Sequence, residues 1–187
     1  MVALVAGYAR TPFTRFTGQL AAQPATVLGP HAVRAALTNA GVAPEQVDSI
    51  VAGQVLQAGA GQNPARQTAV AAGIPLNTPA ITLNAVCLSG TEAVAQAVRL
   101  INAGEAEIVV AVGQESMSLA PHVIPLRAGT KYGSAELVDT VDRDGRVTGP
   151  RQRARRGNLV FRTCPCAAPH GPALGLRRRR RSPSSRT

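Results

Sequence analysis

The apolar residues between positions 1 and 113 alternate between two periods, and this alternation constrains the fold more than any other feature. Short apolar runs predict strands, and apolar residues at positions i, i+3, i+4 and i+7 predict helices between them. The expected strands cover residues 1–9, 49–55, 80–86 and 108–112, and the expected helices cover residues 25–39, 63–72 and 91–103. This βαβαβαβ order is typical of a layered α/β domain with a mostly parallel sheet.

The charged residues divide the chain near Gly145. Ten acidic and eight basic residues lie up to Asp144, whereas twelve arginines and no acidic residue follow Gly145. We expect a folded domain over residues 1–145. Residues 146–187 are rich in Arg and Pro and have no helical or strand period, so they are expected to form a disordered basic tail. One hypothesis is that a shifted reading frame encodes this tail, which a comparison of the three frames of the coding DNA would test.

Composition excludes several classes of protein. No apolar run approaches the ~18 residues that a membrane helix needs, so we expect no membrane partner. The three cysteines cannot form a self-contained disulfide framework, which favours a reducing compartment and a cytoplasmic protein. With 45% hydrophobic residues, the chain has enough apolar material for a packed core.

Cys87 lies where a predicted strand meets a predicted helix. Ser89 and Glu92 have the spacing of a capping box, which predicts that the helix starts at Ser89. A helix N-terminus presents free N–H groups and about half a positive charge, which favour a thiolate over a thiol. A cysteine held there is suited to act as a nucleophile. From the residues alone an alternative stays open, in which Cys87 is a small buried hydrophobe.

The sequence around this cysteine, Asn84-Ala-Val-Cys-Leu-Ser-Gly90, resembles the nucleophile motif of the thiolases, the acyl-CoA:acetyl-CoA acyltransferases. Other segments resemble the same family in order and spacing. They are residues 10–16, 40–48, 53–67 and 112–118, together with Ala120-Pro-His122 and Lys131-Tyr-Gly133. The last two, from about residue 118 onward, are similar to the start of the loop domain that covers coenzyme A. The resemblance implies that residues 1–145 are a thiolase-like N-terminal half.

The resemblance also implies a reaction. Cys87 would attack an acyl-CoA thioester to give an acyl-enzyme, and the deprotonated methyl carbon of acetyl-CoA would then attack the acyl group. The product is a 3-ketoacyl-CoA, and the reverse reaction is thiolysis. Acyl-CoA and acetyl-CoA are thus the expected partners, with no metal or redox cofactor, and the family forms homo-oligomers.

The family uses further groups that this sequence does not supply. A histidine in a Gly-His-Pro motif activates the cysteine, and a second cysteine in a Cys-x-Gly motif moves the proton of the carbon acid. Neither motif occurs in the 187 residues, because the three histidines and the other two cysteines lie in different contexts. They are His31, His122, His170, Cys164 and Cys166. We therefore expect a truncated chain that is inactive by itself.

Some other features suggest different roles. The arginines at positions 177–181 could bind nucleic acid, which gives the alternative of a non-catalytic basic adaptor. Without interleaved aromatic residues this binding is expected to be non-specific. Cys164, Cys166 and His170 are too few and too irregularly spaced for a metal site. For Glu115 we expect a structural hydrogen-bonding role.

Overall fold

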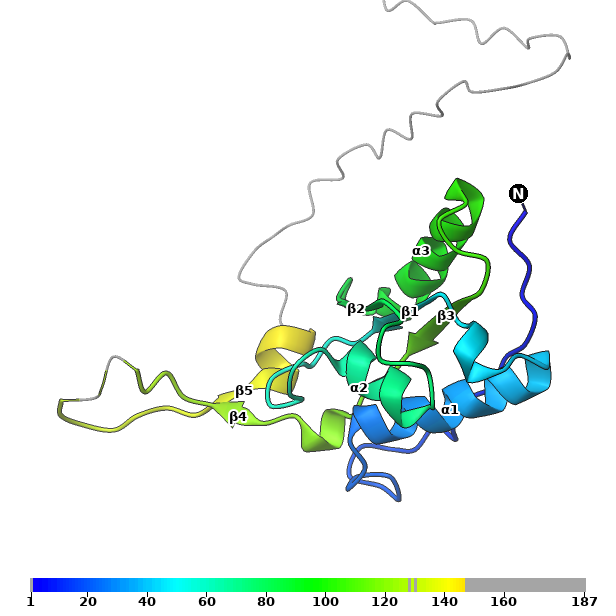
Figure 1. Cartoon of the computed structure of the whole chain (residues 1–187). Coiled ribbons are helices and arrows are strands. Elements are labelled where there is room, and N and C mark those ends of the chain that lie inside the picture. The colour runs from blue at the N-terminus through cyan, green and yellow to red at the C-terminus, as the bar shows by residue number, and fades with distance from the viewer. Residues whose placement is uncertain (1, 128, 130, 147–187) are drawn as a thin grey trace, which may run out of the picture. The chain divides into compact units, whose positions relative to one another are not determined.

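The computed structural model describes residues 2–127, 129 and 131–146 (Figure 1). Its main elements are α1 (Ala25–Ala40), β1 (Ser49–Gly53), α2 (Pro64–Ala71), β2 (Ala80–Leu83), α3 (Ser89–Ala103) and β3 (Val109–Gly113). Shorter elements are the 3₁₀ turns Pro44–Gln46 and Met117–Leu119, the strands β4 (His122–Val123) and β5 (Val138–Asp139), and the π-helix Val141–Arg146. The expected tail therefore falls outside the described residues, apart from Arg146.

The three longer strands form a parallel sheet in the order β2-β1-β3. The register pairs Ile50 of the central strand with Ala80 on one side and with Val110 on the other. The helices α1 and α2 lie on one face of the sheet and α3 on the other (Figure 1), as right-handed crossover connections require. The layered α/β architecture with a parallel sheet is thus confirmed.

Small side chains dominate the core. Every residue of β1 is buried, and the core cluster holds Ile50 and Ala52 from this strand. The facing helices contribute Val33 and Leu37 from α1 and a row of alanines from α2, namely Ala65, Ala69 and Ala72 as α2 ends. Because alanine has no side chain beyond Cβ, α2 can pack close against the sheet.

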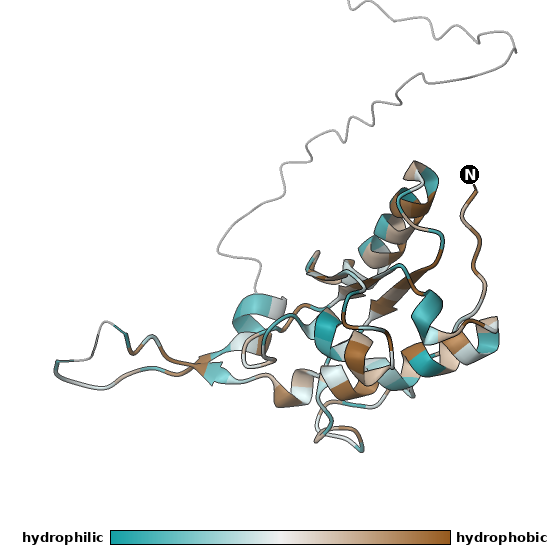
Figure 2. Ribbon diagram, viewed as in Figure 1, coloured by the Kyte–Doolittle hydropathy of each residue, from teal (hydrophilic) through white to brown (hydrophobic). Residues whose placement is uncertain are grey.

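The predicted strand over residues 1–9 is wrong. Residues 2–14 form no strand, and Val2, Leu4 and Val5 are 84%, 84% and 83% exposed. Figure 2 shows this apolar segment running apart from the sheet. A strand needs a partner for its backbone, and this segment does not pair with the outer edge of β2 or of β3, since the sheet contains only β2, β1 and β3. The segment is instead anchored beside α1, where Asn39 Nδ2 donates to the Tyr8 carbonyl at 3.1 Å.

Three other expectations also need correction. The strand expected to reach residue 86 ends at Leu83, because Asn84 begins a turn. The uninterrupted apolar run at residues 108–112 is typical of a strand covered on both faces, but β3 is mostly half-buried, since it lies at an edge of the sheet. A proline within a helix is expected in its first turn, but Pro30 lies well inside α1, so the helix lacks the N–H that would bond to the Thr26 carbonyl.

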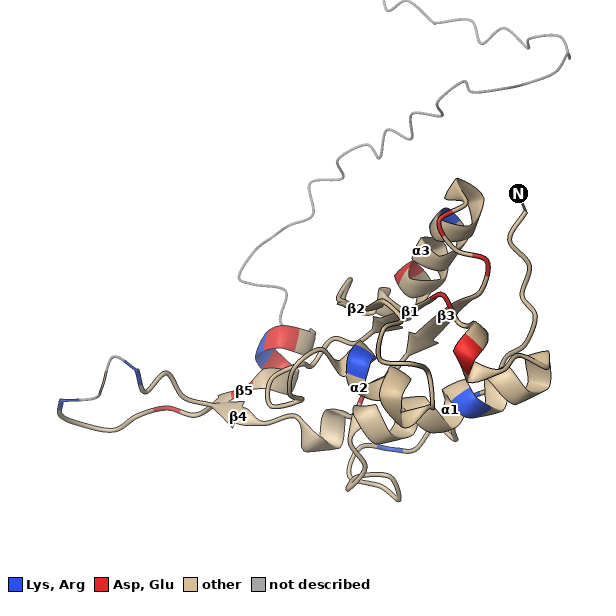
Figure 3. Cartoon of the chain, viewed as in Figure 1, with Lys and Arg blue, Asp and Glu red and all other residues tan. Residues whose placement is uncertain are grey.

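The structure beyond β3 is a short antiparallel ladder in which His122 pairs with Asp139. Thr140 Oγ1 ties it together by donating to the Pro121 carbonyl at 2.7 Å. Along the backbone, charged residues of both signs are scattered over the described part of the chain (Figure 3). Within that part, no helix is both long and apolar enough to span a bilayer.

Candidate active site

Cys87 lies in the connection between β2 and α3, residues 84–88. Its thiol is free and exposed, so the alternative that Cys87 is a buried hydrophobe is wrong. The flanking Val86 and Leu88 are exposed as well. The thiol therefore lies at a surface turn, directly before a helix, where a substrate can reach it from solvent.

The backbone of this turn is strained at Val86. This residue has φ 52°, in the left-handed region, which is an outlier for a side chain branched at Cβ and costs on the order of 1–3 kcal/mol. Three hydrogen bonds hold it there. The Val86 N–H donates to Asn84 Oδ1 at 2.8 Å, and the Val86 carbonyl accepts from Ser89 Oγ at 2.6 Å and from the Ser89 N–H at 3.0 Å. The residue before Cys87 is thus kept in a conformation that valine alone disfavours.

The helix starts at Ser89 as predicted, but the capping box behind that prediction does not form. Leu88 occupies the cap position, and no side-chain hydrogen bond caps the helix. Because Ser89 is itself the first helical residue, its hydroxyl reaches back into the turn, where it accepts from the Ala85 N–H at 2.9 Å. Glu92 forms an ion pair with Arg99 instead. The N-terminus of α3, with its partial positive charge, still lies next to Cys87.

The first turn of α3 packs against the ends of β1 and β3 through glycines. A Cβ on Gly53 would lie 2.7 Å from the Gly90 nitrogen and nearer still to the Ser89 carbonyl group. A Cβ on Gly113 would lie 3.4 Å from the Gly90 Cα. Backbone therefore meets backbone at this contact, which fixes the height of the Cys87 turn above the sheet.

Glu115 has the structural hydrogen-bonding role expected from the sequence. Its half-buried carboxylate accepts from the Val55 N–H at 2.8 Å and from the Leu56 N–H at 3.3 Å. Burial raises the pKa of Glu115 above 4.5, and the N–H groups of Val55, Leu56 and Ser116 oppose that shift. The carboxylate thereby ties the segment after β3 to the loop after β1.

A buried amide network lies beneath this loop, and sequence reasoning missed it. Gln114 Nε2 donates to Gln54 Oε1 at 2.9 Å, and Thr68 Oγ1 donates to Gln114 Oε1 at 2.7 Å. All three side chains are buried, so the network joins β1, β3 and α2. Two glutamines directly after buried strands were the available signal in the sequence.

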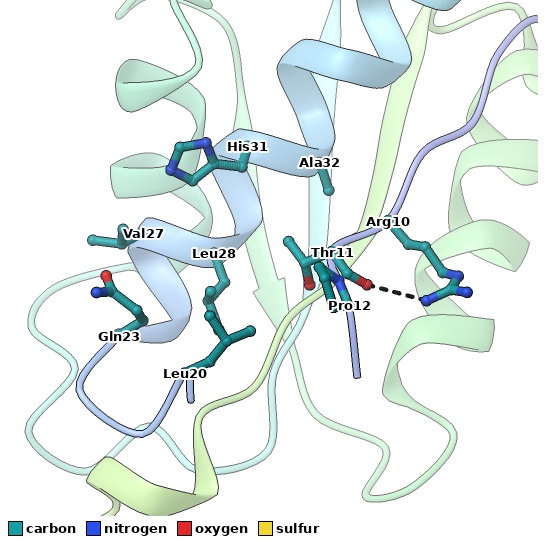
Figure 4. A pocket seen from close by; sticks show the side chains of 9 residues that line it. All are labelled: Arg10, Thr11, Pro12, Leu20, Gln23, Val27, Leu28, His31 and Ala32. Carbon is teal, nitrogen blue, oxygen red and sulfur yellow. Dashed lines mark hydrogen bonds between the residues drawn. The ribbon is translucent and has the colours of Figure 1, made fainter. Parts of the chain in front are cut away.

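A cavity of about 480 Å³ lies between the N-terminal segment and α1 (Figure 4). Leu20 and Leu28 line it together with His31. The Arg10 guanidinium points away from the cavity (Figure 4) and lies 5.2 Å from the centre of the Phe13 ring. Residues 84–88 take no part in the lining, so this cavity is separate from the Cys87 turn.

The two histidines in the described part of the chain, His31 and His122, lie outside that turn. His31 lies on α1, where its Nδ1 is 3.3 Å from Arg34 Nη2, and His122 lies on β4. Over the described ranges, no three His, Cys, Asp or Glu side chains gather closely enough to hold a metal ion. Cys164, Cys166 and His170 lie outside the described residues.

A family model described as "Thiolase, N-terminal domain" matches residues 2–151. The chain belongs to the thiolase family. This confirms the resemblance drawn from the Cys87 motif and from the segments around it.

Relatives and a solved structure agree with this assignment. The chain is 54% identical over 143 residues to an acetyl-CoA acetyltransferase of Cupriavidus necator. The matched residues make up 76% of the chain and 36% of the relative. It is 48% identical over 143 residues to a probable acetyl-CoA acetyltransferase of Escherichia coli, with the same coverage of 76% and 36%. The Acat5 thiolase of Ascaris suum, solved in complex with coenzyme A, superposes with a TM-score of 0.73 at 36% identity. That match covers 75% of this thiolase chain and 36% of the solved one.

This thiolase chain therefore spans about 36% of the length of these relatives. The matched part includes the whole parallel sheet, both of its helical layers and the Cys87 turn.

Proposed function

We propose that Cys87 is the acyl-accepting nucleophile of a thiolase-type acyltransferase to which this chain contributes its N-terminal part. The observation that carries the proposal is an exposed thiol on a strained strand-to-helix turn, at the N-terminus of α3. Such a turn holds the sulfur in a fixed position for nucleophilic attack. The relatives named acetyl-CoA acetyltransferase and the coenzyme A complex of the Ascaris thiolase support coenzyme A thioesters as the substrate class.

The chemistry has two halves. In the first, the Cys87 thiolate adds to the carbonyl carbon of an acyl-CoA, the carbon–sulfur bond to coenzyme A breaks, and the departing thiolate takes up a proton. In the second, a base removes a proton from the methyl group of acetyl-CoA. The resulting carbanion attacks the acyl group on Cys87, and the cysteine leaves as a thiolate. The groups that the resemblance assigns to these proton transfers lie in motifs that the 187 residues do not contain.

The first half is the part of the reaction that this chain can be tested for. With Cys164→Ser and Cys166→Ser introduced, Cys87 is the sole thiol of the full chain. Incubation with acetyl-CoA is expected to add one acetyl group to the peptide that contains Cys87, as detected by mass spectrometry, and Cys87→Ser is expected to abolish the addition. A truncated thioester, S-acetyl-N-acetylcysteamine, serves as the control for general thiol reactivity. If iodoacetamide labels Cys87 but acetyl-CoA leaves it unmodified, the proposal fails.

A further inference from the structure

The strand order brings three chain segments to one edge of the sheet. Because the strands are parallel, the residues that follow them emerge at the same edge. Val55 follows the central strand β1 closely, Asn84 follows β2 directly, and Glu115 follows β3. The segment after β1 therefore lies between the segments that follow its two neighbours.

Val55 is bound from both of these sides. Its N–H donates to Glu115 Oε2 at 2.8 Å, and its carbonyl accepts from Asn84 Nδ2 at 3.2 Å. The Leu56 N–H lies 3.3 Å from both oxygens of the same carboxylate. The backbone of Val55, through its N–H and its carbonyl, thus links the position of Glu115 to that of Asn84.

Asn84 extends this chain of contacts to the strained residue. Its Oδ1 accepts from the Val86 N–H at 2.8 Å, while its Nδ2 binds Val55. One planar amide therefore links the end of the central strand to the residue directly before Cys87. We call Glu115, Val55, Asn84 and Val86, with the hydrogen bonds between them, the strand-end network.

The surroundings of Glu115 indicate that its position matters. Within the described ranges the only ion pair joins Arg99 to Glu92, so backbone N–H groups are the partners of the Glu115 carboxylate. A partly buried carboxylate without a cation is costly to keep. An apolar side chain could cover the same surface, but it could not hold the loop after β1 in register with Asn84.

We propose that Glu115 and Asn84 are positioning residues, which keep Val86 in its left-handed conformation and so hold the Cys87 thiol in place for acyl transfer. This inference rests on the proposed function of Cys87. A conformation that costs free energy persists only where its surroundings enforce it. Loss of either side chain is therefore expected to let the turn relax and to reduce acylation more than it reduces folding.

The experiment uses the full chain with Cys164→Ser and Cys166→Ser. Glu115→Ala is expected to lower the rate of Cys87 acetylation by acetyl-CoA about tenfold, and Glu115→Gln, which keeps one acceptor oxygen, is expected to restore most of it. Asn84→Asp loses the donor to Val55 but keeps the acceptor for Val86, so it is expected to fall between them. Far-UV circular dichroism establishes that each variant folds. If Glu115→Ala does not fold, Glu115→Gln and Asn84→Asp carry the test.

Asp48→Ala is the matched control. The Asp48 carboxylate also accepts from two backbone N–H groups, those of Glu107 and Ile108, at 2.8 and 2.9 Å. This contact lies at the start of β3, at the opposite end of the sheet from Glu115. Asp48→Ala is expected to leave the acetylation rate within about twofold, because a loss of stability alone does not move the turn. Equal losses for Asp48→Ala and Glu115→Ala would refute the positioning role.

A double-mutant cycle with Val86→Gly isolates the strain. Glycine adopts a left-handed φ without a steric penalty, so in the Val86→Gly background Glu115→Ala is expected to cost less than about threefold rather than tenfold. Additive effects of the two substitutions would overturn the inference.

Amide hydrogen exchange of the peptide containing residues 84–88 separates this inference from the proposed function. Glu115→Ala is expected to speed exchange there, and Asp48→Ala is not. If the parent chain is not acetylated while this exchange pattern holds, the proposed function fails and the positioning of the turn stands. If acetylation occurs and exchange is unchanged by Glu115→Ala, the positioning role fails alone.

Discussion

Replacing Gly53 by alanine tests how closely the backbone of β1 meets the first turn of α3 beneath the Cys87 turn. The added Cβ would lie 2.7 Å from the Gly90 nitrogen, where an ordinary contact begins near 3.4 Å. The first turn of α3 would then have to retreat by about 1 Å, since the Ser89 carbonyl group lies nearer still and these backbone atoms cannot rotate away. Overpacking of this kind costs about 1–3 kcal/mol, and the loss of glycine's freedom in the unfolded chain returns about 0.4–1 kcal/mol.

The expected net result for Gly53→Ala is a free energy of unfolding lower by about 1–2 kcal/mol. Gly90→Ala is the matched control on the other side of the same contact. Its Cβ would lie 3.7 Å from the Gly113 Cα, an ordinary distance, and alanine within a helix gains about 0.5 kcal/mol over glycine. The two substitutions are therefore expected to change stability in opposite directions.

Urea unfolding followed by far-UV circular dichroism measures both changes, because the chain contains no tryptophan for fluorescence. The midpoint is expected to fall for Gly53→Ala and to rise slightly for Gly90→Ala, with the slope of free energy against urea unchanged. Equal stability of Gly53→Ala and the parent chain would show that the contact is looser than described. Destabilisation by both substitutions would refute the expectation that a Cβ fits at Gly90 but not at Gly53.

Three further predictions concern pH and activity. Burial raises the pKa of Glu115 above 4.5, so the folded state holds that proton more tightly than the unfolded chain does. The free energy of unfolding should therefore fall as pH rises from 4.5 through the folded pKa. Glu115→Gln should remove this slope in urea titrations. Hydrogen bonds from the N–H groups of Ile108 and then Glu107 lower the pKa of Asp48 below 3.8, so its contribution is present above 3.8 and lost as pH falls through the folded pKa. The slope over that acidic interval should disappear in Asp48→Ala, and an unchanged slope would exclude this origin. The purified chain should show negligible thiolysis of acetoacetyl-CoA, and a measurable rate that Cys87→Ala abolishes would contradict this.

Local sequence patterns predicted those elements whose form depends on near neighbours. The second helix begins at Pro64, within one residue of its expected start, and the third begins at Ser89, where the spacing of Ser89 and Glu92 placed it although no capping box forms. The central strand ends at Gly53, within two residues of the expected end. The strand expected at residues 1–9 failed because an apolar run shows that a segment is suited to a sheet, but it does not show that the segment pairs with one.

The candidate site was predictable only in part, for a similar reason. The position of Cys87 before a helix followed from residues close to it in the sequence. The left-handed valine did not, because β-branched side chains ordinarily favour extended backbone. The contact between Val55 and Glu115 joins residues 60 positions apart, and no local period reports such a separation. The sequence indicated a bonding role for Glu115 without indicating its partner.

The alanine-rich packing between α2 and β1 has a consequence for how this protein is mutated. A conventional scan that shortens each side chain to alanine would pass over Ala65, Ala69 and Ala72 without changing them. Yet these fully or almost fully buried positions leave no room for a longer side chain. Replacement by valine or leucine would force the helix away from the sheet. Where α2 packs on the sheet, the effect of a mutation on stability is therefore measured by enlarging side chains rather than by shortening them.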